Sequence, residues 1–315
     1  MFATLRSFLT SAHSQPSADD EVSCSDELMV IVSDHQRGKR LYAALERQQP
    51  AMPPDDFGVV WRPATGAEWL AAPSGPSPQR GRVLGRRLDN CTLTLRAPSE
   101  DAQQRVDLLE ALLDQHVGLI VDLNAGQLGG VAHDLATSWE AELPDGCHAS
   151  LGVIDVAPAE GLPDSALNHQ LDLRVTRPPE AGAQQARPRK ASIEVVALRT
   201  PVTDQALDLE DALSLVRYCQ GFRDMYPNER VAFLSGDGLG AAVALAAMER
   251  LFIDCGKGRL RPADSEAAVL DHASRLRKSC GPFALFQQDL TTVADFAEYL
   301  AAKPERAVRT GPAQA

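Results

Sequence analysis

The spacing of apolar residues predicts strands and helices that alternate through the middle of the chain. The run NCTLTL over 90–95 alternates between apolar and polar positions, as a half-buried strand does. Further strands are predicted at 117–123, 169–175, 191–198 and 230–234, with short elements at 27–32 and 81–84. Helical spacing predicts helices over 99–116, 210–226, 239–252, 264–279 and 291–302. Because helices dominate the end, this order predicts an α/β or α+β class with a mixed sheet.

Polar segments and Pro/Gly-rich segments mark the ends of the chain and its loops. Residues 1–25 are rich in Ser, Ala and Asp and are predicted to form a flexible N-terminal tail, and residues 303–315 a flexible C-terminal tail. Surface loops are predicted at 49–56, 72–81, 157–163 and 177–188. No long low-complexity stretch separates two halves, and no internal repeat is present. We therefore predict one domain over 26–302.

An excess of acidic residues limits the classes of partner. The 315 residues include 43 Asp and Glu against 31 Lys and Arg, a formal net charge of −12. Nucleic acids and anionic lipids are bound by clustered basic residues, so we expect neither partner. The most apolar run, 231–247, is interrupted by Asp237, and no stretch reaches the roughly eighteen apolar residues that predict a membrane span. The first twenty residues lack a long apolar core, so we expect no Sec-type signal peptide.

The cysteines and histidines show no pattern of a metal site or a disulfide framework. The six cysteines, at 24, 91, 147, 219, 255 and 280, form no CxxC pair, which favours a reducing compartment. The seven histidines include no HExxH pair. We therefore expect no metal and no cofactor.

The most informative feature is a glycine-rich turn between a predicted strand and a predicted helix, in ERVAFL-SGDGLGAA-VALAAMERLF. Glycines at 236, 238 and 240 let the backbone turn tightly without a Cβ penalty. The helix that follows would offer free amide groups and the positive end of its dipole, which together bind anions. The alternative is a plain strand-to-helix turn with close packing.

This turn carries a resemblance to a known family. The family signature is a strand, then His-Cys-x-x-Gly-x-x-Arg-Ser/Thr, then a helix. In VAFLSGDGLGAAV, Leu234 stands in the His place, Ser235 in the Cys place, Gly238 in the Gly place, Ala241 in the Arg place and Ala242 in the Ser/Thr place. The chain thus resembles the protein tyrosine phosphatase domain, above all its bacterial type III secreted effector branch, with a degenerate catalytic loop. That loop comprises Ser235, Gly236, Asp237, Gly238, Leu239, Gly240 and Ala241.

Three further segments occur in the family's order. Residues 96–124 resemble its Gln-Gly-Pro segment with the helix and buried strand that follow. Residues 190–213 resemble the strand that leads into its Trp-Pro-Asp loop, where Asp204 would be the vestigial acid. Residues 274–288 resemble its glutamine loop, for which Gln287 is the best candidate. The resemblance implies an α/β fold with a twisted mixed sheet flanked by helices, and the 235–241 turn at the C-terminal end of a central strand.

The departures from the family signature remove the chemistry that the family performs. A serine hydroxyl with no adjacent base is a poor nucleophile, in contrast to a thiolate of low pKa. Ala241 lacks the guanidinium that binds two phosphate oxygens. Asp237 would repel a phosphate, unless it caps the following helix from within. The resemblance therefore implies a pseudophosphatase that acts through a protein partner, either in the bacterial cytoplasm or, as a candidate effector, secreted into a host cell by a type III system.

Other assignments stay open. Cys255-Gly256-Lys257-Gly258-Arg259-Leu260-Arg261 also fits Cys-x5-Arg, so an active phosphatase using Cys255 and Arg261 is the alternative. The residues before Cys255 continue a helical pattern, which is unlike the family. A third hypothesis is a regulatory partner of a true phosphatase. The run GDGLGAAVALAA resembles the nucleophile elbow of lipases and esterases, but Gly238 occupies the serine place.

Overall fold

The computed structural model describes residues 36–48, 69–71, 83–96, 102–123, 139–144, 146–157, 161–178, 188–198, 207–236, 238–280 and 284–307. Its strands are β1 Trp69–Ala71, β2 Val83–Arg87, β3 Thr92–Arg96, β4 Val117–Asp122, β5 Trp139–Glu142, β6 His148–Ala157, β7 Ala166–Thr176, β8 Arg189–Leu198 and β9 Arg230–Ser235. Within these residues they form one sheet in the order β1-β2-β3-β9-β4-β8-β7-β6-β5. The four central strands β3, β9, β4 and β8 are parallel, and the outer pairs are antiparallel.

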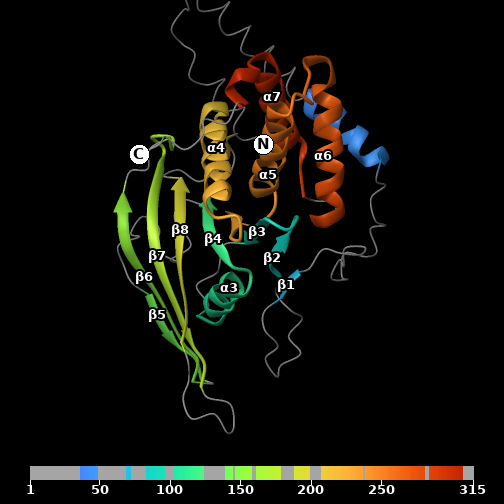
Figure 1. Cartoon of the computed structure of the whole chain (residues 1–315). Coiled ribbons are helices and arrows are strands. Elements are labelled where there is room, and N and C mark those ends of the chain that lie inside the picture. Colours follow the sequence, from blue (N-terminus) through green and yellow to red (C-terminus); the bar gives the residue numbers. More distant parts are fainter. Residues whose placement is uncertain are drawn as a thin grey trace, which may run out of the picture.

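Helices cover both faces of the central strands (Figure 1). The helices are α3 Ala102–Asp114, α4 Leu209–Met225, α5 Ala241–Gly256, α6 Ser265–Cys280 and α7 Gln287–Ala302, and residues 36–48 are also helical. One face of the sheet packs against α3, and the other packs against α4 and α5, with α6 and α7 beyond. The strands β6, β7 and β8 extend past the helices as a long curved meander (Figure 1). The chain therefore has the predicted α/β fold with a mixed sheet.

Two apolar cores lie on the two faces of the sheet, and they explain why the central strand β4 is buried along its whole length. In β4, VGLIVD is buried at every position, so its side chains contribute to both cores. Leu119 and Val121 pack with α4 and α5, whereas Ile120 packs with α3. A continuous apolar run of this kind is typical of a parallel strand that helices cover on both sides.

The structure confirms most of the predicted elements and adds several. The five predicted strands and five predicted helices all form, with ends that differ by up to four residues. Strands β1, β5 and β6 and the helical residues 36–48 were not predicted. The predicted C-terminal tail begins with an ordered segment, because Pro304–Ala307 forms a 3-10 helix that contacts α5. The element predicted at 27–32 and the tail predicted at 1–25 lie outside the described residues.

The described helices include none that is both long enough and apolar enough to span a bilayer.

Two buried histidines predict how stability depends on pH. His169 on β7 is 3% exposed, and neither of its ring nitrogens has a hydrogen-bond partner among the described residues. Burial lowers its pKa. Burial also lowers the pKa of His272, although its Nε2 lies 2.9 Å from Oδ2 of Asp254. Both side chains therefore favour the neutral form in the folded protein.

We expect the free energy of unfolding to fall as the pH drops below about 6.5. In that range the histidines of the unfolded chain bind protons, whereas His169 and His272 in the folded protein stay neutral to lower pH. Each such proton contributes a slope of at most about 1.4 kcal/mol per pH unit. Urea unfolding measured between about pH 7.5 and pH 5.5 tests this. His169→Leu should flatten the dependence, and His148→Leu, at an exposed position on β6, should leave it unchanged. Equal slopes in the wild type and His169→Leu would contradict the assignment.

Candidate functional site

The glycine-rich turn lies at the carboxyl edge of the parallel strands, between β9 and α5. The strand beside it, β3, is followed by α3, which packs on the opposite face from α5. Adjacent parallel strands whose connections lead to opposite faces leave a crevice at their carboxyl ends, where α/β proteins bind ligands. The topology therefore places the candidate site at residues 235–241, at the end of a central strand, as the resemblance implied.

Ser235 is the last residue of β9, and its side chain is directed toward α5. The residue is 5% exposed, and its Oγ donates a hydrogen bond to the carbonyl oxygen of Leu239 at 3.1 Å. Its register partner is Arg96 at the end of β3, so these two side chains share one face of the sheet. Asp122 at the end of β4 is paired with Leu234, so its buried carboxylate lies on the other face. The nearest same-face neighbour of Ser235 in the sheet is therefore a cation and not a base.

Two glycines shape the turn through positive φ angles. Gly238 has a φ of 72°, and a Cβ at this position would lie 3.1 Å from the backbone nitrogen of Arg96. Gly240, at φ 45°, precedes the first residue of α5. Glycine adopts such angles without the clash that a Cβ causes. The predicted tight turn is thus packed against the end of β3, which is the close packing that the alternative interpretation of the turn expected.

Groups of the protein itself lie at the amino end of α5. The amide of Gly240 donates to the carbonyl oxygen of Ala284 at 3.1 Å, and the amide of Ala242 donates to the carbonyl oxygen of Leu239 at 3.0 Å. Both carboxylate oxygens of Asp289 lie 3.9 Å from the position that a Cβ of Gly240 would take. The same carboxylate accepts a hydrogen bond from the amide of Phe286 at 2.8 Å and so caps α7. A carboxylate of the fold thus lies beside the residue that precedes α5, near the end of the helix whose dipole favours negative charge.

The segment that contains Gln287 approaches the turn through other residues. Gln287 is the first residue of α7, in the segment whose Ala284 carbonyl and Asp289 carboxylate meet Gly240. Asp237, inside the turn, and Asp204, the predicted vestigial acid, both lie outside the described residues. Ala241 is the first residue of α5 and is half-buried.

Cys255 and Arg261 lie at the opposite end of α5 from Ser235. Cys255 follows Ala241 by fourteen residues of one helix, which corresponds to about 21 Å. Its buried thiol is 3.6 Å from the carbonyl oxygen of Leu300, and burial, followed by the Glu305 carboxylate, raises its pKa. Arg261 is exposed and precedes the 3-10 helix Pro262–Asp264. A buried thiol of raised pKa within a helix lacks the properties of a thiolate nucleophile.

Sequence reasoning missed three charged residues of this edge. Arg96 and Asp122 each directly follow an apolar strand core, and that position could have identified them, because the carboxyl ends of parallel strands meet at one edge. Asp289 gave no comparable signal. Its capping of α7 is a local contact, whereas its position beside Gly240 depends on how α7 packs against α5.

Comparison with known proteins leaves the family undecided, because no family model and no curated protein matches the chain. Within the described residues, no group of three or more His, Cys, Asp or Glu side chains is arranged to hold a metal ion.

Proposed function

We propose that the protein is a non-catalytic, tyrosine-phosphatase-like binding protein, a pseudophosphatase that acts through a protein partner. The observation that carries the proposal is that groups of the protein itself lie beside Gly240 at the amino end of α5. The Gly240 amide already donates to the Ala284 carbonyl oxygen, and the Asp289 carboxylate lies 3.9 Å from the position that a Cβ of Gly240 would take. A like charge at about 4 Å from the Asp289 carboxylate would be repelled by roughly 1 kcal/mol in water and about 4 kcal/mol at an effective dielectric constant of 20.

The environment of Ser235 supports the same conclusion. A serine attacks phosphorus efficiently when a neighbouring base takes its proton. Here the hydroxyl donates to a backbone carbonyl, and its same-face neighbour across the strands is Arg96. Ala241 supplies no guanidinium at the start of α5. Under this proposal, Ser235 stands in the place of the thiolate nucleophile and Ala241 in the place of the phosphate-binding arginine. Neither residue can supply the chemistry of the group that it replaces.

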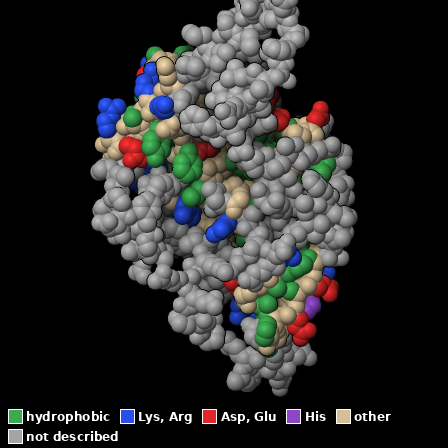
Figure 2. Space-filling model, turned by 180° about the vertical axis from the view of Figure 1, so that it is seen from behind, with side chains coloured by type: hydrophobic (Ala, Val, Ile, Leu, Met, Phe, Trp, Pro, Cys, Tyr) green, Lys and Arg blue, Asp and Glu red, His purple; other side chains and the backbone are tan. Residues whose placement is uncertain are grey.

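The surface charge is compatible with a protein partner. On the face shown in Figure 2, acidic and basic side chains of the described residues are interspersed, and they form no continuous basic area there. A secreted effector and a regulatory partner of a true phosphatase are both forms of this proposal. They differ in where the partner resides, in a host cell or in the bacterium.

An aryl phosphate assay tests the catalytic part of the proposal. We expect the wild type, Ser235→Cys alone and Ala241→Arg alone to show no hydrolysis above background, because each lacks the nucleophile, the arginine or both. Activity that arises in the double variant Ser235→Cys with Ala241→Arg would support the alignment of the loop with the family signature. Hydrolysis by the wild type would overturn the proposal, and its loss in Cys255→Ser would assign the activity to the alternative site.

Binding of vanadate tests the amino end of α5 independently of catalysis. We expect no saturable binding to the wild type by calorimetry. Vanadate binding that Arg96→Gln abolishes would show that Arg96 has taken over the role of the missing arginine, and the proposal would then fail. Asp289→Asn is the informative companion variant, because it removes the repelling charge and keeps an oxygen that can cap α7.

A further inference from the structure

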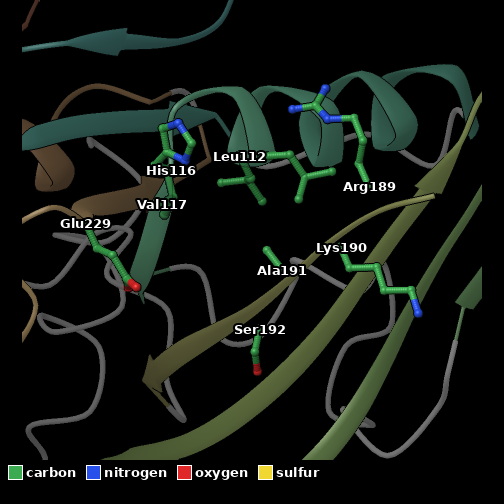
Figure 3. A pocket seen from close by; sticks show the side chains of 9 residues that line it. Leu112, His116, Val117, Arg189, Lys190, Ala191, Ser192 and Glu229 are labelled. Atoms are coloured by element: carbon green, nitrogen blue, oxygen red, sulfur yellow. The ribbon is translucent and has the colours of Figure 1, made fainter. Parts of the chain in front are cut away.

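A cavity of about 410 Å³ lies at the opposite edge of the sheet from Ser235, at the amino ends of β4 and β8 (Figure 3). Its floor contains Leu112 and Val117, and its rim carries His116, Glu229 and the first residues of β8. The volume falls within the range of about 300 to 1,000 Å³ that is typical of small-ligand sites. None of these residues takes part in the function proposed above.

The cavity exists because β8 begins before its neighbour. The first residue of β8 that pairs with β4 is Glu194, opposite Leu119. Counting back along both strands places Val117, the first residue of β4, level with Ser192, so residues 189–191 extend past the start of β4. On their other side these residues pair with β7, antiparallel and in register. In an antiparallel strand, alternate residues direct their backbone N–H and C=O groups away from that partner. Among the described residues, no strand pairs with this edge of 189–191, and the cavity lies beside it.

An unpaired strand edge is a template for an extended peptide, which adds backbone hydrogen bonds as a further strand would. The overhang of residues 189–191 is about 10 Å long at 3.3 Å per residue. The α3–β4 turn and His116 close its inner end, which leaves room for two or three residues of a ligand (Figure 3).

Charges at the two ends of the cavity define the ligand's termini. Figure 3 shows Glu229 at one end and Arg189 and Lys190 at the other, with the Arg189 side chain directed toward α3 and the Lys190 side chain directed to the other side of β8. One guanidinium nitrogen of Arg189 binds Asp114 at 2.7 Å, and a guanidinium has five N–H donors, so others remain for a ligand. These groups match a zwitterion, with its ammonium group at Glu229 and its carboxylate group at Arg189 and Lys190.

The backbone beneath Glu229 is adapted to that side chain. Gly118 is a bulge in the pairing of β4 with β9. A Cβ at Gly118 would collide with the Glu229 carboxylate and would lie 2.8 Å from Cζ of Phe222. A glycine inside a strand marks a place where another group approaches the backbone closely. Here it lets the carboxylate of Glu229 lie against the sheet at the inner end of the cavity.

His116 is held in a conformation that favours another residue. It follows the end of α3 with a φ of 51°, and its amide donates to the carbonyl oxygen of Leu113 at 3.3 Å. Glycine is the usual residue at such a helix end, because a side chain there is strained. A strained residue at the rim of a cavity is typical of a functional position. The histidine is therefore not explained by the helix end alone.

From the overhanging edge of β8 and the opposed charges, we propose that this cavity binds the backbone and both charged termini of a short, extended peptide of two or three residues. Its amino terminus lies at Glu229 and its carboxyl terminus at Arg189 and Lys190, so the peptide runs antiparallel to β8. The free peptide, rather than a single amino acid, is the ligand class because the two charged ends are separated along the strand.

Calorimetry with the tripeptide Ala-Leu-Ala tests the site. We expect saturable binding that weakens at least tenfold when the peptide is N-acetylated, C-amidated or N-methylated at its central amide, and that leucine alone does not reproduce. Glu229→Gln and Lys190→Gln should each weaken binding of the unmodified peptide at least fivefold. The matched variants Glu140→Gln and Lys257→Gln, at exposed positions elsewhere, should not.

The urea midpoint of a His116 variant and the limits of peptide affinity provide two further tests. His116→Gly should raise the urea midpoint, because it relieves the strained φ, and should weaken peptide binding. No binding at up to about 10 mM peptide would overturn the proposal. Equal binding by leucine or by the capped peptides, or an unchanged affinity in Glu229→Gln, would overturn it as well. None of these outcomes depends on the turn at Ser235.

Discussion

Replacing Glu249 by alanine is expected to lower the free energy of unfolding by about 3 to 5 kcal/mol, because it leaves the largely buried Arg223 guanidinium without its carboxylate partner. Glu249 on α5 is 3% exposed. Its Oε1 accepts from Nε2 of Gln220 at 2.7 Å and from Nε of Arg223 at 2.9 Å, both on α4. Arg223 also donates to the carbonyl oxygen of Cys91 at 2.6 Å and so ties both helices to the start of β3.

The adjacent residue supplies the control. Arg250 forms a partly exposed ion pair with Asp89 at 3.0 Å, and Arg250→Ala should cost less than about 1 kcal/mol. A second test is the double variant Glu249→Ala with Arg223→Met, which removes both charges. Urea unfolding should show that the double variant loses much less than the sum of the single losses. Additive losses, or a cost below about 1 kcal/mol for Glu249→Ala, would mean that the pair is not a buried unit.

Replacing Gly238 by alanine is expected to cost about 2 to 4 kcal/mol of stability and to distort the turn after β9. Two costs combine at this position. An alanine at a φ of 72° costs about 1 to 2 kcal/mol by itself. Its Cβ would in addition lie 3.1 to 3.3 Å from backbone atoms of Leu95 and Arg96, which cannot move aside as a flexible side chain would. The measurement is urea unfolding of the purified variant.

Gly258 separates the two costs. It has a φ of 68°, and a Cβ there would meet no atom within 4 Å. Gly258→Ala should therefore show the conformational cost alone, about 1 to 2 kcal/mol. If Gly238→Ala proves no more costly than Gly258→Ala, then the turn can move away from β3, and the packing at the carboxyl edge does not constrain it.

The periodicity of the sequence predicted the elements that have strong local signals. Strand β4 is a continuous apolar run, and α4 has an Asp208 side chain that accepts from the amides of Glu210 and Asp211 at its start. Strand β6 was missed because Gly152 and a register shift between Val153 and Asp155 interrupt its alternation. Strand β1 has three residues, too few for a period to emerge.

The sequence predicted the backbone of the candidate site, a strand followed by a glycine turn and a helix. It did not predict which side chains surround that turn. The strand, the glycine turn and the helix around 235–241 follow one another in the chain, so local spacing is enough to place Ser235 between a strand and a helix. The neighbours that decide its chemistry come from far away in the sequence. Parallel pairing of β3 with β9 places Arg96 beside Ser235. Packing of α7 beside α5 places Asp289 near Gly240.

By itself, then, the sequence determined the order of strands and helices, the tight turn after the central strand, and the presence of Ser235 and Ala241 in that turn. These are properties of residue type and of spacing within about twenty positions, which the local backbone expresses directly. Tertiary structure alone decided that a carboxylate lies near the start of α5 and that β8 overhangs β4 beside Glu229. Both depend on register and packing between segments distant along the chain, and a single sequence does not encode those relations in any local pattern.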